Sequence, residues 1–264
     1  KIAVSGGGVG GMETARIAAK RGHDVTIYEK GSQLGGTTLA ANVPDYKDAS
    51  RRLLTWFEKE IRESGVKVEL NRELTAAEVK ALGADAVVVS TGAHHKIPNI
   101  PGVHGANVTT AVDMLLGKAQ IGQKVVVVGG GQVGCEVAYE LLRAGKQVSL
   151  VEFLDGLMAG GTEPVSAAVV LMLEDLLNYH HADIRLSTAV KEIKLASVLV
   201  EKAGVTEEIP ADTVVLAAGF VENNGLFQEL KDMGQEVYLV GDAKKSPGNI
   251  MHAVADGNKV GREI

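Results

Sequence analysis

Ile2-Ala-Val-Ser-Gly-Gly-Gly-Val-Gly-Gly11 sets the architecture of this chain. The segment runs from a short apolar strand into glycines with the spacing G-x-G-x-x-G, namely Gly6, Gly8 and Gly11. A helix is predicted over residues 11–21, and the strand after it ends on Glu29, 23 residues beyond the first glycine. A strand, a glycine turn, a helix and a second strand with an acidic end form the context that the dinucleotide-binding fingerprint requires.

Each glycine of the fingerprint has a physical task. Gly6 permits a tight turn, Gly8 lets the backbone approach a pyrophosphate, and Gly11 lets the helix pack closely on the strand. The helix N-terminus then offers unpaired N–H groups and the positive end of its dipole to the phosphates. Glu29 can accept a hydrogen bond from a ribose hydroxyl. For a single copy of the pattern, a plain tight turn with a solvent-facing glutamate stays open as an alternative.

The pattern occurs twice, which strengthens the interpretation. Residues 6–29 align without a gap with residues 129–152 at an offset of 123, so the four key positions recur at Gly129, Gly131, Gly134 and Glu152. A second echo, at an offset of 127, aligns residues 84–92 with residues 211–219; both are strands that end in a glycine turn. Two ordered repeats indicate an α/β protein with two Rossmann-like domains, each built on a parallel, doubly wound sheet with both faces covered.

Composition bounds the classes of function. The 264 residues carry a net charge of −6 and no block rich in Lys or Arg, so neither nucleic acid nor an anionic membrane surface is expected as a partner. No apolar run approaches the length of a membrane span, and we expect a cytoplasmic protein. The chain opens directly on a strand without an initiator Met, which is typical of a module within a longer polypeptide.

Cysteine and histidine usage limits redox and metal chemistry. Cys135 is the one cysteine, which excludes an internal disulfide, a CxxC redox pair and an iron–sulfur cluster held by this chain alone. It directly follows the third glycine of the second copy, at a helix N-terminus that would lower the pKa of a nucleophilic thiol, but with no second cysteine we interpret it as a packing residue. The pairs His94-His95 and His180-His181 would place adjacent side chains on opposite faces of a strand, so no metal site is predicted.

Two further segments distinguish the copies. Lys30-Gly-Ser-Gln-Leu-Gly-Gly36 adds a second glycine pair after the first acidic residue, and no such pair follows Glu152. Near the end of the chain, Val237-Tyr-Leu-Val-Gly-Asp242 predicts a strand that delivers an aspartate at its carboxyl end. A helix is expected to start near Asn249.

With these segments the chain resembles the two-dinucleotide-binding flavoproteins of the pyridine nucleotide-disulfide oxidoreductase-like fold. Within them it is similar to the C-terminal FAD/NAD(P)-binding module of the 2,4-dienoyl-CoA reductase, 2-enoate reductase and trimethylamine dehydrogenase family. The likeness runs over the whole chain and includes both fingerprints, Leu34–Gly36, Ser90–Gly92, Ala217–Gly219 and Gly241-Asp242. It implies an NAD(P)H-binding domain (residues 101–220) inserted into a discontinuous FAD-binding domain (residues 1–100 and 221–264).

The resemblance also implies which residues hold the cofactors. Those for FAD are Gly6, Gly8, Gly10, Gly11, Glu29, Lys30, Gly35, Gly36, Thr91, Gly92, Gly241, Asp242 and Asn249. Those for NAD(H) are Gly129, Gly131, Gln132, Val133, Gly134, Glu152 and Gly219. Asp242 is implied to hold the ribityl chain, and the helix start near Asn249 to face the N1/O2 edge of the flavin. Glu136 lies where related enzymes place a catalytic glutamate near the nicotinamide, although a glutamate there also suits the helix dipole, as Glu13 does in the first copy.

The implied activity is hydride transfer from NADH to FAD, with electrons passed on for enoate- or enoyl-CoA-type reduction. The implied partner is an N-terminal FMN/iron–sulfur barrel domain of the same polypeptide or another electron acceptor, and a homo-oligomer is a further expectation. Two alternatives stay open: a non-redox ADP-binding structural module of a larger dehydrogenase, and a free-standing NADH:acceptor reductase. NADH is predicted over NADPH, because Glu152 would repel a 2′-phosphate and residues 151–155 contain no cation.

Overall fold

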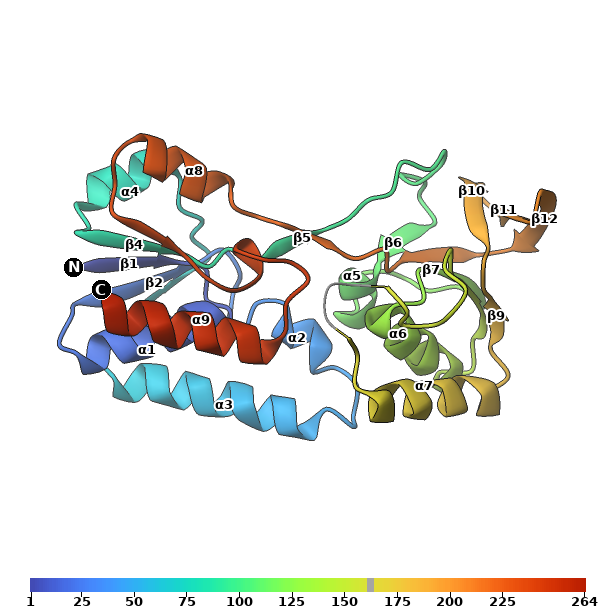
Figure 1. The fold of residues 1–264 in the computed structure, drawn as a ribbon, viewed down its shortest axis with the longest axis horizontal. Coiled ribbons are helices and arrows are strands. Elements are labelled where there is room, and N and C mark those ends of the chain that lie inside the picture. The colour runs from blue at the N-terminus through green and yellow to red at the C-terminus, as the bar shows by residue number, and fades with distance from the viewer. Residues whose placement is uncertain (161–163) are drawn as a thin grey trace. The chain divides into compact units, whose positions relative to one another are not determined.

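The chain forms two compact units in a computed structural model that describes residues 1–160 and 164–264. The first unit comprises residues 1–94 and 220–264, and the second comprises residues 95–219. The chain passes between the units through β5 (Ala93–His95) and β14 (Phe220–Glu222), which pair with each other (Figure 1). The second unit is thus a continuous segment within the sequence of the first.

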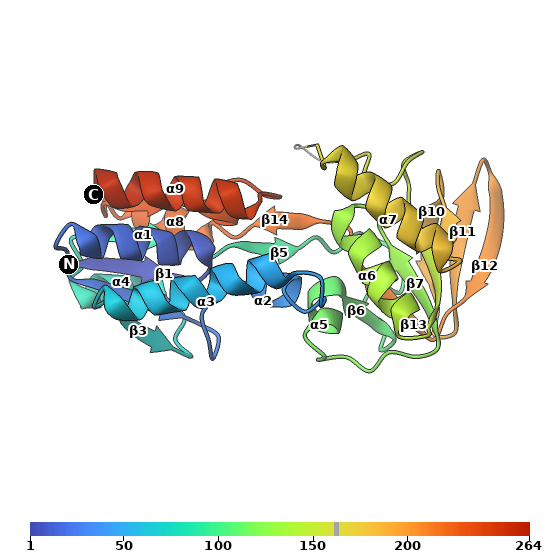
Figure 2. The same cartoon turned by 90° about the horizontal axis from the view of Figure 1, so that it is seen from below.

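The first unit is a parallel sheet between two layers of helices. Its remaining elements are β1 (Ile2–Ser5), α1 (Val9–Lys20), β2 (Val25–Glu29), α2 (Thr38–Ala41), α3 (Asp48–Glu63), β3 (Lys67–Leu70), α4 (Ala76–Leu82), β4 (Ala86–Val89), α8 (Gly225–Asp232), β15 (Val237–Leu239), the 3-10 turn η1 (Gly241–Ala243) and α9 (Ile250–Glu263). The five parallel strands have the order β15-β4-β1-β2-β3. Helices α1, α3 and α9 cover one face, and α4 and α8 cover the other (Figure 1 and Figure 2).

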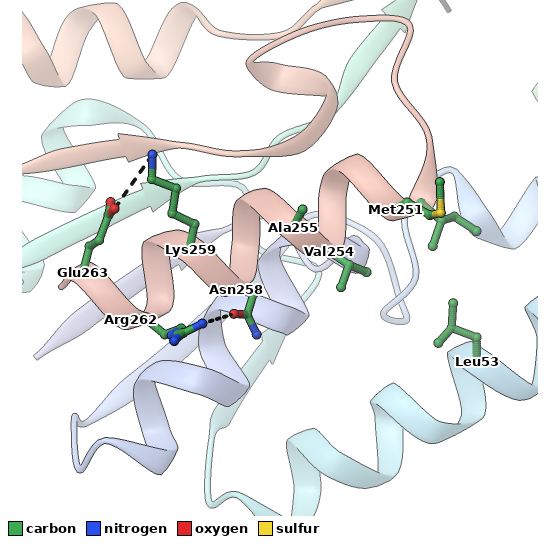
Figure 3. Close-up of a pocket in the computed structure, with 9 residues that line it drawn as sticks. Leu53, Met251, Val254, Ala255, Asn258, Lys259, Arg262 and Glu263 are labelled. Atoms are coloured by element: carbon green, nitrogen blue, oxygen red, sulfur yellow. Dashed lines mark hydrogen bonds and ion pairs between the residues drawn. The ribbon is translucent and has the colours of Figure 1, made fainter. Parts of the chain in front are cut away.

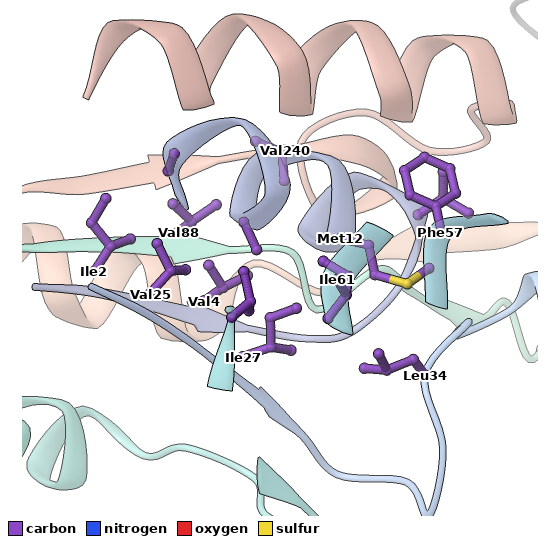
Figure 4. Packing of buried hydrophobic residues seen from close by; sticks show 14 of the residues in the cluster. Ile2, Val4, Met12, Val25, Ile27, Leu34, Phe57, Ile61, Val88 and Val240 are labelled. Carbon is purple, nitrogen blue, oxygen red and sulfur yellow. The ribbon is translucent and has the colours of Figure 1, made fainter. Parts of the chain in front are cut away.

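Alternate strand residues of this sheet face opposite helical layers. Ile2 and Val4 pack with Met12 and Phe57 on the α1/α3/α9 face (Figure 4), whereas Ala3 packs on the α4/α8 face. Because both faces are covered, every residue of β1, β2 and β4 is buried. This double cover explains the nearly continuous apolar sequences of β1 and β4, whereas β2 also buries Thr26 and Glu29. The predicted α/β class is confirmed.

Glycines let α9 lie directly on α1. A Cβ on Gly257 would lie 2.5 Å from the Gly10 carbonyl oxygen, and a Cβ on Gly261 would lie 2.9 Å from the Thr14 carbonyl oxygen. The resemblance assigns Gly10 to FAD binding. In the structure, Ala253 of α9 lies beside it: a Cβ on Gly10 would lie 3.4 Å from the Ala253 carbonyl oxygen. Gly257 and Gly261 are therefore the glycines that this close approach requires, whereas a Cβ on Gly10 would make ordinary van der Waals contact with α9.

The second unit has helices on one face of its parallel sheet and an antiparallel sheet on the other. Its elements are β6 (Val108–Thr110), α5 (Ala111–Leu115), β7 (Lys124–Val128), α6 (Gln132–Arg143), β8 (Gln147–Val151), α7 (Ala167–Tyr179), β9 (Asp183–Arg185), β10 (Ala189–Ile193), β11 (Ser197–Lys202), β12 (Val205–Pro210) and β13 (Thr213–Leu216). The parallel order is β6-β13-β7-β8-β9. Residues of α6 and α7 pack on one face, and the antiparallel β10-β11-β12 packs on the other. Sequence analysis did not predict these three antiparallel strands.

Two local expectations differ from the structure. The first fingerprint helix begins at Val9 rather than Gly11, because Gly8 has the extended backbone of an N-cap (φ −71°, ψ 178°). His180 and His181 do not lie on a strand: they follow the last turn of α7, and His181 has φ +56°. The prediction that a strand holds His180 and His181 on opposite faces is therefore wrong.

Candidate functional site

The β1–α1 turn places the first fingerprint at the carboxyl edge of the first unit's sheet. Gly6 has φ +106°, and a Cβ there would lie 2.4 Å from the Ser90 carbonyl oxygen. A Cβ on Gly11 would lie 2.1 Å from the Gly6 carbonyl oxygen, so the helix can approach the strand this closely only with glycine there. Gly8 has no described atom within 4 Å of its missing Cβ, and no side chain caps the helix. The first N–H groups of α1 therefore point to open space that an anion can fill.

The second fingerprint repeats this geometry. Gly129 has φ +109°, and a Cβ on Gly134 would lie 1.8 Å from the Gly129 carbonyl oxygen. Gly131 caps α6 with φ −70° and ψ 178°, nearly the angles of Gly8, and its missing Cβ also faces open space. The other residues assigned to the nicotinamide nucleotide lie beside this turn or after the neighbouring strand β13: Gln132, Val133 and Gly219 (φ +97°).

Glu29 and Glu152 each brace the glycine turn of their own unit. Glu29 is only 8% exposed, and its two carboxylate oxygens accept from the N–H groups of Gly7 (2.7 Å) and Gly31 (2.6 Å). Glu152 accepts two equivalent bonds, from Gly130 N–H (2.5 Å) and Leu154 N–H (2.7 Å). A carboxylate has about four acceptor positions, so each glutamate keeps capacity for a ribose hydroxyl. Sequence analysis found the acidic residues but missed this bracing contact.

The second glycine pair closes over the first turn, and the other unit has a counterpart. Gly35 N–H donates to the turn at the Gly7 carbonyl oxygen (2.9 Å), while Lys30 lies exposed ahead of this loop. In the second unit, Met158 N–H donates to the Gly130 carbonyl oxygen at 2.8 Å, and Met158 has φ +54°. The second unit has no glycine pair at the equivalent positions after Glu152, as the sequence shows, but its loop makes the same contact with the turn. Met158 makes this contact with a left-handed backbone, which glycine adopts more readily.

The loop after β4 reaches the same edge of the first sheet. The Ser90 hydroxyl donates to the Gly6 carbonyl oxygen at 2.6 Å, which ties this loop to the fingerprint turn. The Thr91 hydroxyl donates to the Asn223 carbonyl oxygen at 2.5 Å, and Gly92 turns the chain with φ +72°. Ser90 belongs to a quoted motif but was not itself predicted as a site residue.

The loop after β15 carries the predicted aspartate. Gly241 has φ +63°, and Asp242 Oδ1 accepts from the Gly248 N–H at 3.2 Å. Burial raises the pKa of Asp242 above its ordinary value, with the Gly248 hydrogen bond acting in the opposite direction. The Asn249 side chain caps α9 by accepting from the His252 N–H at 2.9 Å. The structure therefore commits the side chain of Asn249 to its own helix, and leaves Asp242 as the acidic group of this loop.

Two buried polar side chains in these loops test whether an organic cofactor fits. Asn42, 9% exposed, follows α2, and neither atom of its amide has a hydrogen-bond partner in the described part of the chain. The Ser246 hydroxyl, between Asp242 and Asn249, is likewise buried and unpartnered among those residues. An unpaired buried polar group costs about 1–3 kcal/mol. Because these side-chain atoms are covered by the protein itself, the fit to FAD rests instead on the uncapped N-terminus of α1, which faces open space, and on the braced carboxylate of Glu29. These suit a ligand that has a pyrophosphate and a ribose, as FAD has.

Glu136 and Glu13 occupy equivalent positions but have different surroundings. Glu136 is half-buried at the fifth position of α6, beyond the first turn, and accepts from Gln132 Nε2 at 3.0 Å. Glu13 is 2% exposed and accepts from both Arg16 (2.8 Å) and Asn258 Nδ2 (2.8 Å). Glu13 therefore joins α1 to α9, and its presence is no argument that Glu136 serves the helix dipole alone.

Cys135 is a packing residue in the structure. It is fully buried, and its thiol donates to the Gly130 carbonyl oxygen at 3.4 Å. Burial raises the pKa of Cys135 to about 12, so the thiol is protonated at neutral pH. Across residues 1–160 and 164–264, no three His, Cys, Asp or Glu side chains gather as metal ligands. No helix in those ranges is long and apolar enough to cross a membrane.

An open groove of about 830 Å³ runs along the outer face of α9 in the first unit (Figure 3). Leu53 of α3 and apolar residues of α9, such as Val254, line one part of it. The other part contains the Lys259–Glu263 ion pair (3.8 Å) and a hydrogen bond from Arg262 to Asn258 (3.4 Å). None of the predicted cofactor residues lines this groove.

The parallel sheets and their two braced G-x-G-x-x-G turns are the features of a protein with two dinucleotide-binding domains. The family model for pyridine nucleotide-disulphide oxidoreductases matches residues 1–257. The chain belongs to this family, which binds FAD and NAD(P).

Individual relatives confirm the narrower resemblance to the 2,4-dienoyl-CoA reductase group. Cinnamate reductase of Clostridium sporogenes is 37% identical over 265 residues, which cover 100% of this chain and 39% of that protein. NADH oxidase of Thermoanaerobacter brockii is 37% identical over 269 residues, covering 100% of this chain and 41% of the oxidase. A structure of 2-naphthoyl-CoA reductase with 2-naphthoyl-CoA matches with a TM-score of 0.93 and 31% identity, over 100% of this chain and 40% of the reductase. The chain thus spans about two fifths of the length of these relatives.

Proposed function

We propose that this chain is the electron-input module of a larger flavoprotein reductase, in which NADH transfers hydride to FAD. The observation that carries the proposal is the pair of braced turns, one in each unit, each with a bare helix N-terminus. Two such turns serve two dinucleotides. The family's binding of FAD and NAD(P) supplies the chemical identities.

FAD is assigned to the first unit because its sheet also carries β15, followed by Gly241-Asp242, the strand end that the resemblance assigns to FAD. Glu29 would bind the adenosine ribose, and the N-terminus of α1 would bind the pyrophosphate. The remaining, flavin-bearing part of FAD is rich in hydroxyl, carbonyl and N–H groups. Asp242, in the loop after β15, offers hydrogen bonds for that part.

NADH is assigned to the second unit. The N-terminus of α6 would bind its pyrophosphate, and Glu152 would accept from its adenosine ribose. Glu136, half-buried at the fifth position of the same helix, is the proposed catalytic residue near the nicotinamide. When bound, FAD and NADH supply the hydride chemistry, and the chain's contribution is to position them and to set the charge around them.

The electron acceptor is proposed to lie in another domain of the polypeptide. Relatives matched over the whole of this chain are named cinnamate reductase and 2-naphthoyl-CoA reductase, so we infer an enoate- or enoyl-CoA-type substrate. Cys135, the one cysteine, cannot ligate an iron–sulfur cluster by itself. The FMN and the cluster of the implied barrel domain would therefore be held by residues outside this chain.

The absorption spectrum of the purified protein tests the proposal. We expect a yellow protein whose flavin absorbance bleaches when NADH is added without oxygen. A colourless protein that releases ADP on denaturation would instead support the structural-module alternative. A yellow protein that NADH does not bleach would refute the assignment of the second unit.

A further inference from the structure

Glu222, the last residue of β14, braces the loop that leads from β15 to α9. Its Oε1 atom accepts a hydrogen bond from the Ser246 N–H at 2.9 Å. This bond lowers the pKa of Glu222 below its ordinary value, so the side chain is a charged acceptor at neutral pH. Two positions further along the loop, the Gly248 N–H donates to Asp242 Oδ1 at 3.2 Å. Two carboxylates therefore hold alternate N–H groups of one short loop.

The strand end that carries Glu222 is itself tied to the loop after β4. The Asn223 N–H donates to the Gly92 carbonyl oxygen at 3.0 Å, and the Thr91 hydroxyl donates to the Asn223 carbonyl oxygen at 2.5 Å. Glu222 therefore joins the loop after β4 to the loop after β15. Both loops contain residues that the resemblance assigns to FAD, whereas Glu222 itself was not predicted as a site residue.

The order of the strands shows which half of FAD these two loops would meet. The sheet runs β15-β4-β1-β2-β3, with the fingerprint turn after β1 and Glu29 at the end of β2. A pyrophosphate at the turn and a ribose at Glu29 would place the adenosine on the β2 side, so the flavin half would extend to the other side, over β4 and β15. Neighbouring strands are about 4.8 Å apart, so β15 lies about 14 Å from β2. The loop after β15 is therefore out of reach of the adenosine.

We propose that Glu222 is a positioning residue for the flavin half of FAD, an inference that rests on the proposed FAD site. It acts through the backbone, because its bond to Ser246 fixes the loop between Asp242 and α9. Glu29 and Glu152 brace the glycine turns in the same way, by accepting backbone N–H groups. A loop that is held in place before binding loses less conformational freedom when the ligand binds. Loss of the brace should therefore weaken the binding of FAD but not of ADP, which has no flavin half.

The test measures the affinities of the full-length protein, stripped of flavin, for FAD and for ADP. Glu222→Asp keeps the charge but shortens the side chain by one methylene, so the carboxylate no longer reaches the Ser246 N–H. Glu222→Gln keeps the length and an acceptor oxygen but removes the charge. We expect the dissociation constant for FAD to rise about tenfold in Glu222→Asp and at most about twofold in Glu222→Gln, because only the shorter side chain loses the hydrogen bond. The constant for ADP should stay unchanged in both. Glu229→Asp, at an exposed position of α8 in the same unit, is the matched control.

Three outcomes would overturn the inference. Unchanged FAD affinity in Glu222→Asp would mean that the brace does not position the loop. A loss in Glu222→Gln as large as that in Glu222→Asp would mean that the charge matters and the hydrogen bond does not. A parallel loss of FAD and ADP binding would mean that Glu222 supports the whole unit rather than the flavin half of the site. Failure of the proposed function has a different signature: the wild type would bind ADP but not FAD.

Discussion

The choice between NADH and NADPH is predicted to depend on the fixed position of one carboxylate. Glu152 is held by two backbone N–H groups, at 2.5 and 2.7 Å, so it cannot swing away from a 2′-phosphate on the ribose. Two like charges about 4 Å apart repel by roughly 1–4 kcal/mol, depending on local screening. Since Glu152 is half-buried, we expect the lower part of this range, about tenfold weaker binding of NADPH.

One basic residue lies closer than the sequence suggested. The backbone carbonyl oxygen of Arg185, in β9, accepts a hydrogen bond from the Glu152 N–H (2.9 Å). The two residues therefore lie side by side. The Arg185 guanidinium is already paired with Asp183 (2.8 Å) and Glu207 (2.6 Å). A 2′-phosphate would have to compete with both carboxylates, so Arg185 does not reverse the preference for NADH.

Stopped-flow reduction of the bound flavin by each nucleotide measures this preference. Glu152→Gln removes the charge but keeps one acceptor oxygen, so it is a better probe than Ala, which would leave two backbone N–H groups unpaired. We expect Glu152→Gln to improve NADPH binding about tenfold and to weaken NADH binding slightly. High salt should narrow the difference in the wild type by screening the repulsion. Glu140→Gln, on the same helix as Glu136, is the control. If the native protein reacts faster with NADPH, or if Glu152→Gln leaves the ratio unchanged, the carboxylate does not set the preference.

Three further outcomes follow from the geometry. Gly11→Ala should lower the free energy of unfolding by about 3 kcal/mol, because its Cβ would meet the Gly6 carbonyl oxygen at 2.1 Å. Gly8→Ala should lower it by at most about 1 kcal/mol and mainly weaken FAD retention. Denaturant titration measures the first effect and flavin release the second. Cys135→Ser should leave the rate of flavin reduction by NADH nearly unchanged, since a thiol with a pKa of about 12 is not a nucleophile at neutral pH; a large loss in a folded variant would contradict this. Burial raises the pKa of Asp242, so the flavin-free protein should lose stability as the pH rises from the ordinary value of an aspartate through the raised one, because the folded form binds the proton more tightly. Asp242→Asn should abolish that loss in melting curves taken across the pH range, while FAD affinity falls about tenfold.

The parallel core of each unit could be predicted because its signals are local. Fully buried strands such as β4 and β13 consist mostly of β-branched residues, and a glycine with positive φ, Gly92 or Gly219, turns the chain three residues after each of them. The antiparallel β10–β12 sheet has weaker signals. β12 is exposed at most of its positions, and the tight hairpin before it uses Ala203 (φ +50°) with Gly204. Asn-Gly at these two turn positions is a strong sequence signal for a hairpin, whereas Ala-Gly is not, so the hairpin could not be predicted.

Some residues of the candidate site could likewise be predicted from local sequence signals, and others could not. The glycines and the two braced glutamates were predictable, because the fingerprint requires specific residue types at fixed spacing. Glu222 and Arg185 were not, because nothing in their sequence neighbourhood distinguishes them from ordinary charged residues. Their significance lies in which groups surround them in the folded chain, namely the Ser246 N–H for the first and the adjacent Glu152 for the second.

The two units build one turn from partly different residues, and the differences show which features the geometry requires. In both units a carboxylate at the end of the second strand accepts from the second residue of the glycine turn. In both, a residue with positive φ from the following loop donates to that same turn, but it is Gly35 in one unit and Met158 in the other. The brace and the donor are therefore the physical requirements, and glycine in the outer loop is one of two ways to meet the second. What differs between the units is instead the set of polar groups beyond the turn: the first unit adds Asp242 and Glu222, and the second has Arg185 beside its brace. The shared turn thus accounts for binding a dinucleotide, and these additional groups account for which dinucleotide each unit is proposed to bind.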